Sequence, residues 1–173
     1  MYPKNASLSI LMTCLLAATS VFAAPAMPTV KVEPLAGISL TLPDDLPHRP
    51  CVFVVGFSKP SRAQTMQWSQ RLEQEPLAEK ASIYSVAVLE DVPALLRKFV
   101  VGGIRSGVPD ALHNRFLVAT SDATAWKDAV SYSDADAAYL ILVNAGRDIV
   151  WRATGPLTDA ALRSLVDALN AMM

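Results

Sequence analysis

The residues best placed for chemistry form a short polar turn that follows an apolar run. The run is Cys51–Gly56, and an unbroken apolar stretch of this kind predicts a strand buried on both faces. The turn consists of Ser58, Lys59, Pro60 and Ser61. Proline fits the first turn of a helix, and Ser61 with Gln64 has capping-box spacing, so we expect a helix to begin here and to run to about Glu75. Proteins with α/β folds place reactive groups at such helix N-termini, because free amides and the helix dipole point at the turn.

Two kinds of catalysis could use this turn. Thiol–disulfide exchange needs a low-pKa thiolate and a resolving thiol, and the hydroxyls of Ser58 and Ser61 supply neither. A serine-dependent enzyme could use Ser58 as a nucleophile elbow, although Pro60 stands where that motif has a glycine. Asp91 and His113 follow in the correct chain order for a triad. A serine that caps a helix is the simpler interpretation, and an enzyme related to the oxidoreductases or dependent on serine is the alternative hypothesis.

Thiol and imidazole groups are too few for a metal centre. Cys51 begins the buried strand, which indicates a small apolar core residue rather than a reactive thiol or an intermolecular disulfide. Cys14 lies in an N-terminal apolar segment, and the two histidines, His48 and His113, have no ligand spacing. Tight transition-metal sites need several convergent nitrogen or sulfur ligands. We therefore expect no metal site and no cofactor.

A basic segment after residue 96 is the second candidate site. Its cationic side chains are Arg97, Lys98, Arg105, His113 and Arg115. Apolar residues alternate with these groups where an α/β fold needs only a crossover, and a helix here is expected to end at Gly102 and Gly103. One interpretation is a solvated helix face over an ordinary core contact. The other is a docking surface for an acidic or membrane-proximal protein partner, and we expect such contacts here rather than at the serine turn.

Length and composition limit the classes of protein to which this chain can belong. The chain has 173 residues, of which 52% are hydrophobic and 18% charged, and this balance suits one compact domain. The formal net charge of −1 gives no electrostatic basis for binding nucleic acid, which requires a basic face. No motif indicates a small-molecule ligand.

The N-terminus predicts export from the cytoplasm. Lys4 precedes an apolar run over residues 8–18, and Val21 and Ala23 are the small residues of a cleavage site. We expect residues 1–23 to form a signal peptide and the protein to be periplasmic or secreted. A retained anchoring helix and lipidation at Cys14 are the alternatives.

The remaining elements predict a mixed α/β sheet. Residues 24–36, which are rich in proline, are expected to form an extended tether, and residues 37–173 the domain. The expected strands are Ile38–Leu42, Cys51–Gly56, Ile83–Leu89, Arg115–Thr120, Tyr139–Val143 and Ile149–Thr154. Helical segments separate most of them, which requires parallel pairing, whereas the last two strands form an antiparallel hairpin. Thr158 is expected to cap a final helix that packs on the sheet.

This order of elements resembles the thioredoxin fold. In secreted thioredoxin-like proteins an aromatic residue precedes a Cys-x-Pro-Cys motif, and here Phe57 precedes Ser58-Lys59-Pro60-Ser61. Serine stands at both cysteine positions. The proline that normally precedes the hairpin is also absent, and Asp136-Ala137-Ala138 stands there. The resemblance therefore implies the fold without its redox chemistry.

A narrower resemblance suggests a role in assembly. The segments Val86–Asp91, Leu96–Arg115 and Ile149–Gly155 are similar to the family of mitochondrial F-type ATP synthase assembly factors with a thioredoxin-like domain. Those proteins are non-enzymatic and assist the assembly of a membrane complex. The resemblance implies a redox-inactive protein of the cell envelope that acts by binding a protein partner, such as a subunit of a membrane complex.

Overall fold

A mixed sheet with helices on both faces makes up the described part of the chain. The computed structural model describes residues 24–172, so the expected signal peptide lies outside the described residues. The strands are β1 (Val30–Pro34), β2 (Leu40–Leu42), β3 (Cys51–Gly56), β4 (Ser82–Val88), β5 (Phe116–Ala119), β6 (Tyr139–Val143) and β7 (Ile149–Thr154). The helices are α1 (Arg62–Gln74), α2 (Leu77–Lys80), α3 (Ala94–Gly107), α4 (Ala123–Val130) and α5 (Asp159–Asn170), with a 3-10 turn η1 (Asp110–Leu112). Within residues 24–172, no helix is long and apolar enough to span a bilayer.

The expected α/β fold class is confirmed by the sheet topology. The strand order is β2-β1-β5-β4-β3-β6-β7. Strands β3, β4 and β5 are parallel to one another, and β6 runs antiparallel to both β3 and β7. The predicted closing hairpin is therefore present, and it joins the sheet beside the central strand β3.

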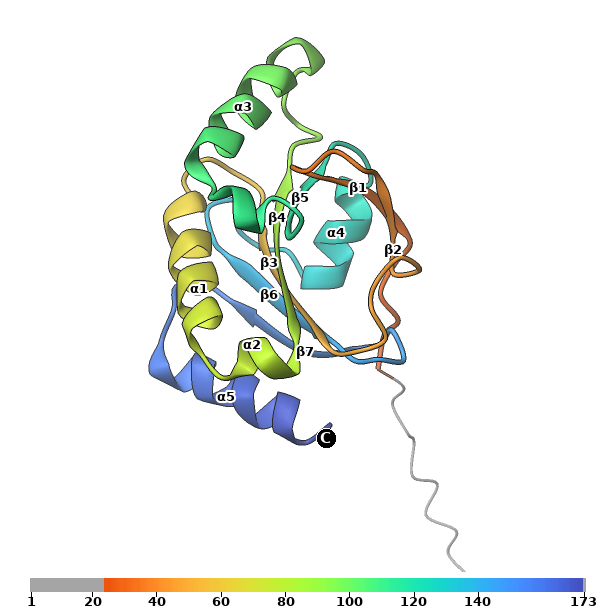
Figure 1. The fold of residues 1–173 in the computed structure, drawn as a ribbon, viewed down its shortest axis with the longest axis vertical. Helices are drawn as coiled ribbons and strands as arrows, with labels where there is room; N and C mark the ends of the chain where they lie inside the picture. The colour runs from red at the N-terminus through yellow and green to blue at the C-terminus, as the bar shows by residue number, and fades with distance from the viewer. Residues whose placement is uncertain (1–23, 173) are drawn as a thin grey trace, which may run out of the picture.

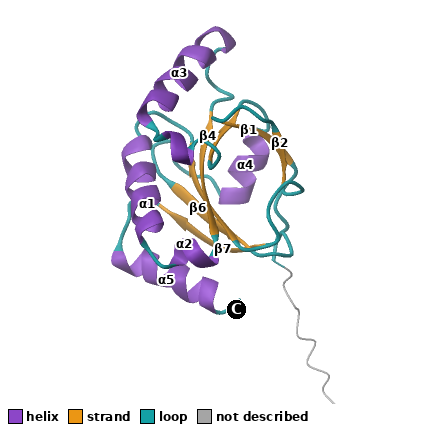
Figure 2. Ribbon diagram, in the orientation of Figure 1, coloured by secondary structure: helices purple, strands orange, loops and turns teal. Residues whose placement is uncertain are grey.

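Successive residues of β3 supply two separate cores. Val52 and Val54 face α1, α2 and α5, and they pack with Trp68 and Leu165 among others. Cys51, Phe53 and Val55 face α4 and belong to the same core as Trp126. Figures 1 and 2 show α1, α2 and α5 along one side of the sheet and α4 on the other. The prediction of a strand buried on both faces is confirmed.

The expected tether is wrong for residues 30–34. These residues form β1, which pairs antiparallel with β2 and with β5. Val30, Val32 and Pro34 are buried and alternate with the exposed Lys31 and Glu33. The sheet thus begins before residue 37, because an alternating pattern that prolines flank can still form one short strand.

Helix α3 does not end at its paired glycines. It continues through Gly102 and Gly103 to Gly107, and Val108 then adopts an extended conformation before Pro109. A residue before proline avoids the helical region, so Pro109 explains this end. Each interior glycine weakens a helix by about 1 kcal/mol relative to alanine, yet the tertiary setting retains the helix.

The start of α3 is fixed by an arginine rather than by an aspartate cap. Arg97 donates from Nε to the Val92 carbonyl at 2.9 Å and from Nη2 to the Glu90 carbonyl at 2.8 Å. Asp91, which precedes the helix and has a side chain of a kind that can cap one, instead lies 3.6 Å from Lys127 of α4. The segment that enters α3 is therefore held by a side chain from the helix itself.

The final helix has the predicted cap and the predicted buried face. The Thr158 hydroxyl accepts a hydrogen bond from the Ala161 amide at 3.1 Å, and Leu162, Leu165 and Leu169 are buried. The hydroxyl satisfies an amide that would otherwise lack an intrahelical partner.

We expect Thr158→Ala to lower the free energy of unfolding by about 1 kcal/mol, because the Ala161 amide loses its partner. Urea denaturation followed by circular dichroism measures the change. Thr158→Ser, which keeps the hydroxyl, is the matched control and should lose much less. Equal losses in the two variants would contradict the capping role.

Candidate functional site

Hydrogen bonds close the serine turn on itself and tie it to the segment before β6. The Ser58 hydroxyl donates to the Asp136 carboxylate at 2.9 Å and accepts the Ser61 amide at 3.1 Å. The Ser61 hydroxyl, in a side chain only 1% exposed, donates to the Ser58 carbonyl at 2.8 Å. Both hydroxyls are therefore committed as donors within the domain.

The expected capping box does not form. Ser61 occupies the N-cap position of α1 but its side chain accepts no amide from the first turn of the helix. The Gln64 side chain instead reaches the segment before β6, where its Oε1 accepts the Ala138 amide at 3.1 Å. Proline has no amide hydrogen, so this bond depends on the absence of the proline that usually precedes the hairpin.

The three residues of the serine-hydrolase hypothesis form no hydrogen-bonded chain. Ser58 donates to Asp136, whereas His113 contacts the Val108 carbonyl through Nε2 at 3.0 Å. Asp91 pairs with Lys127. A serine nucleophile needs a base within hydrogen-bond reach that a third group orients, and these contacts direct the three side chains elsewhere.

Cys51 lies in the core and is a poor nucleophile. It is 1% exposed, and burial raises the pKa of its thiol to about 11, against a smaller opposing effect of Arg147 and Arg49. The neighbouring Tyr84 also has a raised pKa, again chiefly because of burial. A thiolate is the reactive form of cysteine, so the strand holds this thiol in its inert form.

Aromatic rings pack behind the serine turn. Phe57 lies against Tyr132 and Tyr139 with ring centroids 5.0 and 5.6 Å apart. The Tyr139 hydroxyl accepts the amides of Ser133 and Asp134 and donates to the Asp134 carbonyl. Burial raises the pKa of Tyr139, but hydrogen bonds from the Ser133 hydroxyl and from the Asp134 and Ser133 amides outweigh it and lower the pKa overall. The cluster fixes the end of β3 against the start of β6.

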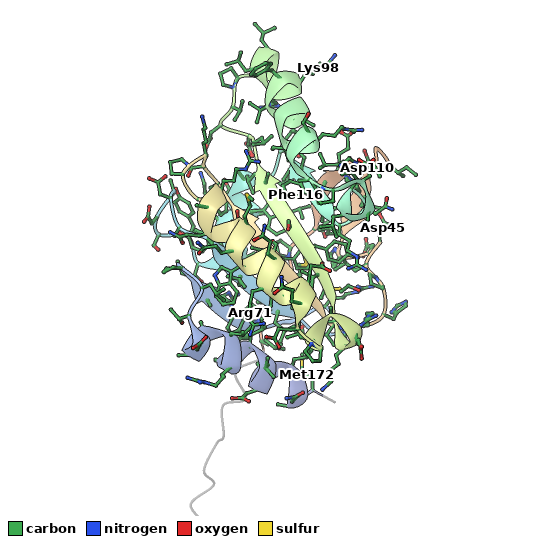
Figure 3. The ribbon with its side chains drawn as sticks, turned by 60° about the vertical axis from the view of Figure 1, so that its left-hand side comes forward. Asp45, Arg71, Lys98, Asp110, Phe116 and Met172 are labelled. Atoms are coloured by element: carbon green, nitrogen blue, oxygen red, sulfur yellow. The ribbon has the colours of Figure 1, made fainter. Side chains whose placement is uncertain are left out.

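The basic segment is spread over three parts of the chain, and most of its cations already have partners. Arg97 fixes the start of α3, as described above, and Arg105 donates to the Leu35 carbonyl after β1. His113 contacts Val108 and lies 3.6 Å from Asp110, and Arg115 pairs with Glu73 of α1 at 3.4 Å. Lys98 extends from the outer part of α3, away from the sheet (Figure 3). The structure therefore uses four of the five side chains for contacts inside the domain, and their binding of a partner stays a prediction.

Exposed apolar side chains on α3 are the stronger binding feature, and of these the sequence pattern of alternating basic and apolar residues included only Phe99. Leu95 is 95% exposed and Phe99 83% exposed, with Leu96 beside them at 54%. No residue of α3 is fully buried. Their helical spacing could have signalled one apolar face, but only the structure shows that the face is uncovered.

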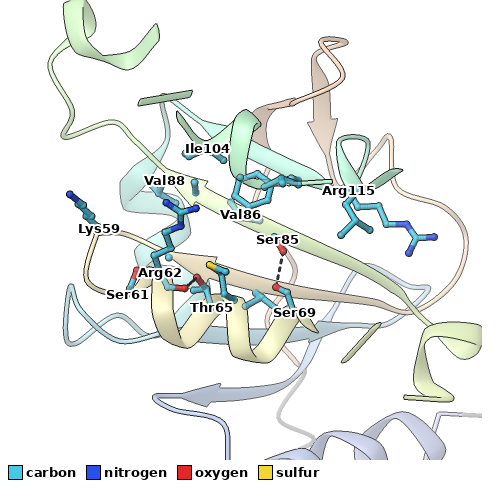
Figure 4. Close-up of a pocket in the computed structure, with 18 of the residues that line it drawn as sticks. Lys59, Ser61, Arg62, Thr65, Ser69, Ser85, Val86, Val88, Ile104 and Arg115 are labelled. Atoms are coloured by element: carbon cyan, nitrogen blue, oxygen red, sulfur yellow. Dashed lines mark hydrogen bonds between the residues drawn. The ribbon is translucent and has the colours of Figure 1, made fainter. Parts of the chain in front are cut away.

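A pocket of about 730 Å³ lies between α1 and α3, over the C-terminal part of β4. Val86 and Val88 of β4 line it, as do Val100 and Ile104 of α3 and Met66 of α1. Figure 4 shows Lys59 and Arg62 at one side and Arg115 at the other, with a hydrogen bond between Ser69 and Ser85. The serine turn forms one margin of this pocket. Within residues 24–172 as a whole, the structure has no group of three or more His, Cys, Asp or Glu residues that could hold a metal ion.

Comparison with known proteins identifies the fold. No protein-family model matches the chain, and no curated protein matches it in sequence. Solved structures do match. A putative thiol:disulfide interchange protein DsbE from Chlorobium tepidum superposes with a TM-score of 0.59 at 13% identity, over 84% of this chain and 96% of that one. BsSco, a member of the Sco family of cytochrome c oxidase assembly proteins, superposes with a TM-score of 0.54 at 13% identity, over 85% and 95% of the two chains.

An exposed lipoprotein thioredoxin from Streptococcus pneumoniae gives a TM-score of 0.57 at 10% identity, over 81% of this chain and 99% of that one. These identities are too low to carry function, and the narrower resemblance to ATP synthase assembly factors stays a prediction. The architecture is nevertheless plain: the chain has the thioredoxin-like fold of the DsbE, Sco and thioredoxin-like proteins.

Proposed function

We propose that this protein is a redox-inactive thioredoxin-like protein of the cell envelope that acts by binding another protein. One observation carries the proposal. The two positions that need thiols hold Ser58 and Ser61, and the hydroxyls of both are bonded within the domain. Thiol–disulfide exchange requires an attacking and a resolving thiol, and the one cysteine in residues 24–172 is buried with a raised pKa.

Placement in the envelope is supported by the N-terminal sequence and by the structural neighbours. Residues 1–23 have the charged start, the apolar run and the small residues of a signal peptide. One neighbour is itself described as an exposed lipoprotein thioredoxin. Both observations favour a protein that works outside the cytoplasm.

The binding surface is the uncovered apolar face of α3. Leu95, Leu96 and Phe99 form an apolar patch at one end of the molecule, with Lys98 beside it. Exposed apolar patches on soluble domains commonly mark contact sites, and aromatic residues often anchor them. The adjacent cation suits a partner with acidic residues near its own apolar surface.

A role in assembling a membrane complex is the finer part of the proposal. BsSco, which shares the fold, belongs to a family of cytochrome c oxidase assembly proteins. The sequence separately resembles assembly factors of ATP synthase. Both comparisons favour a non-catalytic assistant that contacts a client through its surface.

We expect the wild-type protein not to accelerate insulin reduction by dithiothreitol, because it has no thiol at the helix N-terminus. Turbidity of precipitating insulin is the measurement. Ser58→Cys/Ser61→Cys is the matched variant and should form an intramolecular disulfide on oxidation. Acceleration by the wild type would overturn the redox-inactive assignment.

Cys51 should resist thiol reagents in the native state. With its pKa raised from 9.0 to about 11, it has about a hundredfold less thiolate near neutral pH than an ordinary cysteine. Labelling with a chromogenic disulfide reagent at pH 8 should therefore be much slower in buffer than in urea. A Cys14→Ser background leaves Cys51 as the one thiol. Equal rates in buffer and urea would show that the thiol is accessible.

Leu95→Ser/Phe99→Ser should weaken partner capture by about thirtyfold or more, since truncating anchor residues commonly costs 2 kcal/mol or more. Crosslinking in membranes of the source cells, with quantification of each crosslinked protein, is the measurement. Ile38→Ser is the control, because Ile38 is 77% exposed and lies between β1 and β2 rather than on α3. If the control and the double variant capture partners equally, α3 is not the contact surface.

A further inference from the structure

The pocket between α1 and α3 has the size and the walls of a small-molecule site. Its volume of about 730 Å³ lies within the roughly 300–1,000 Å³ typical of ligand pockets. The walls in its middle part are mostly apolar, from Ile83 and Ala87 of β4 below to Val100 and Ile104 of α3 above. The pocket meets the outer patch at Phe99, which lines it, whereas Leu95 and Leu96 do not.

Two pairs of polar groups in the lining are bonded to each other. The hydroxyls of Ser69 and Ser85 lie 2.8 Å apart and hydrogen-bond to each other. Glu73, the one carboxylate of the lining, is paired with Arg115 at 3.4 Å. The middle of the pocket therefore offers few unpaired polar groups to a ligand, and burying a ligand's polar atoms there would carry a desolvation cost.

Two cations without partners lie at the side of the pocket opposite Arg115 (Figure 4). Within the described chain, the side-chain nitrogens of Lys59 and Arg62 take part in no hydrogen bond or ion pair. Arg62 reaches from α1 towards α3, so far that a Cβ added at Gly107 would lie 2.7 Å from its Nη2 (Figure 4). Asp136, whose carboxylate accepts a hydrogen bond from the Ser58 hydroxyl, does not line the pocket. The margin near the N-terminus of α1 is thus positively charged and complementary to an anion.

A peptide fits this pocket less well than a hydrocarbon chain does. Strand β4, which forms the floor, pairs with β3 on one side and β5 on the other, so no strand edge is available to a peptide backbone. Backbone amides and carbonyls buried among apolar walls without partners are costly. A hydrocarbon chain has no such groups.

We propose that this pocket binds a single-chain amphiphile with a carboxylate head group. The head group pairs with Arg62 and Lys59, and the hydrocarbon chain lies along β4 beneath Val100 and Ile104. Arginine suits the head group, because its planar guanidinium can donate two parallel hydrogen bonds to a carboxylate. The inference does not depend on the protein-binding function proposed above.

Calorimetric titration of the full chain with octanoate, decanoate and dodecanoate, each below its micelle concentration, tests the proposal. Affinity should rise about fourfold for each added methylene, as expected when each is transferred from water into an apolar site. Decyltrimethylammonium, with the opposite charge, should bind at least tenfold more weakly than decanoate. Equal binding of the two decyl compounds, or no rise with chain length, would overturn the proposal.

Arg62→Gln should weaken decanoate binding about tenfold and leave decyltrimethylammonium binding no weaker. Arg163→Gln is the control, since Arg163 is an exposed cation of α5 that does not line this pocket. An equal effect of both variants would show that the protein's general charge, and not this site, attracts the carboxylate.

Two adjacent glycines give a matched test of the pocket itself. A Cβ added at Gly102 or at Gly103 would meet no atom within 4 Å, but only Gly103 lines the pocket. Both substitutions improve helix propensity, so neither should prevent folding. We expect Gly103→Phe to weaken decanoate binding at least fivefold and Gly102→Phe to leave it unchanged. Undiminished binding by folded Gly103→Phe would place the ligand elsewhere and overturn the proposal.

Discussion

The rest of the structure depends on the burial of β3 between two helical layers and two neighbouring strands. Its residues from Cys51 to Val55 are all buried, and they contribute alternately to the core under α1 and the core under α4. Pairing is parallel to β4 and antiparallel to β6, with Val55 opposite Tyr139. This register places the end of β3 beside the start of β6, and it therefore determines where the serine turn lies.

The junction between α1 and β6 is held together by polar contacts. Two hydrogen bonds cross it, from the Ser58 hydroxyl to Asp136 and from the Ala138 amide to Gln64. The same two parts of the chain would carry the thiols and the proline of a thioredoxin-like oxidoreductase. In this chain, Ser58 and Ser61 stand at the thiol positions and Ala138 stands at the proline position. The hydrogen bonds of the Ser58 hydroxyl and of the Ala138 amide join these two parts of the chain.

Sequence reasoning recovered the elements whose patterns are local. The apolar run of β3, the hairpin of β6 and β7, and the cap at Thr158 each follow from neighbouring residues. Strand β1 was missed because its stability comes from β2 and β5, which lie elsewhere in the chain. The end of α3 was misplaced since glycine propensity is a weak local effect that tertiary contacts override. The pocket could not be predicted, because α1 and α3 meet only in the folded chain.

Among the α-helices of residues 24–172, α3 is the one whose retention is not explained by burial. It has two interior glycines and no fully buried residue, and arginine contacts from Arg97 and Arg105 fasten it to other parts of the domain. Its inner side faces the pocket through Val100 and Ile104, while its outer side presents Leu95. A ligand that packs against the inner side would add apolar contacts to a weakly held helix.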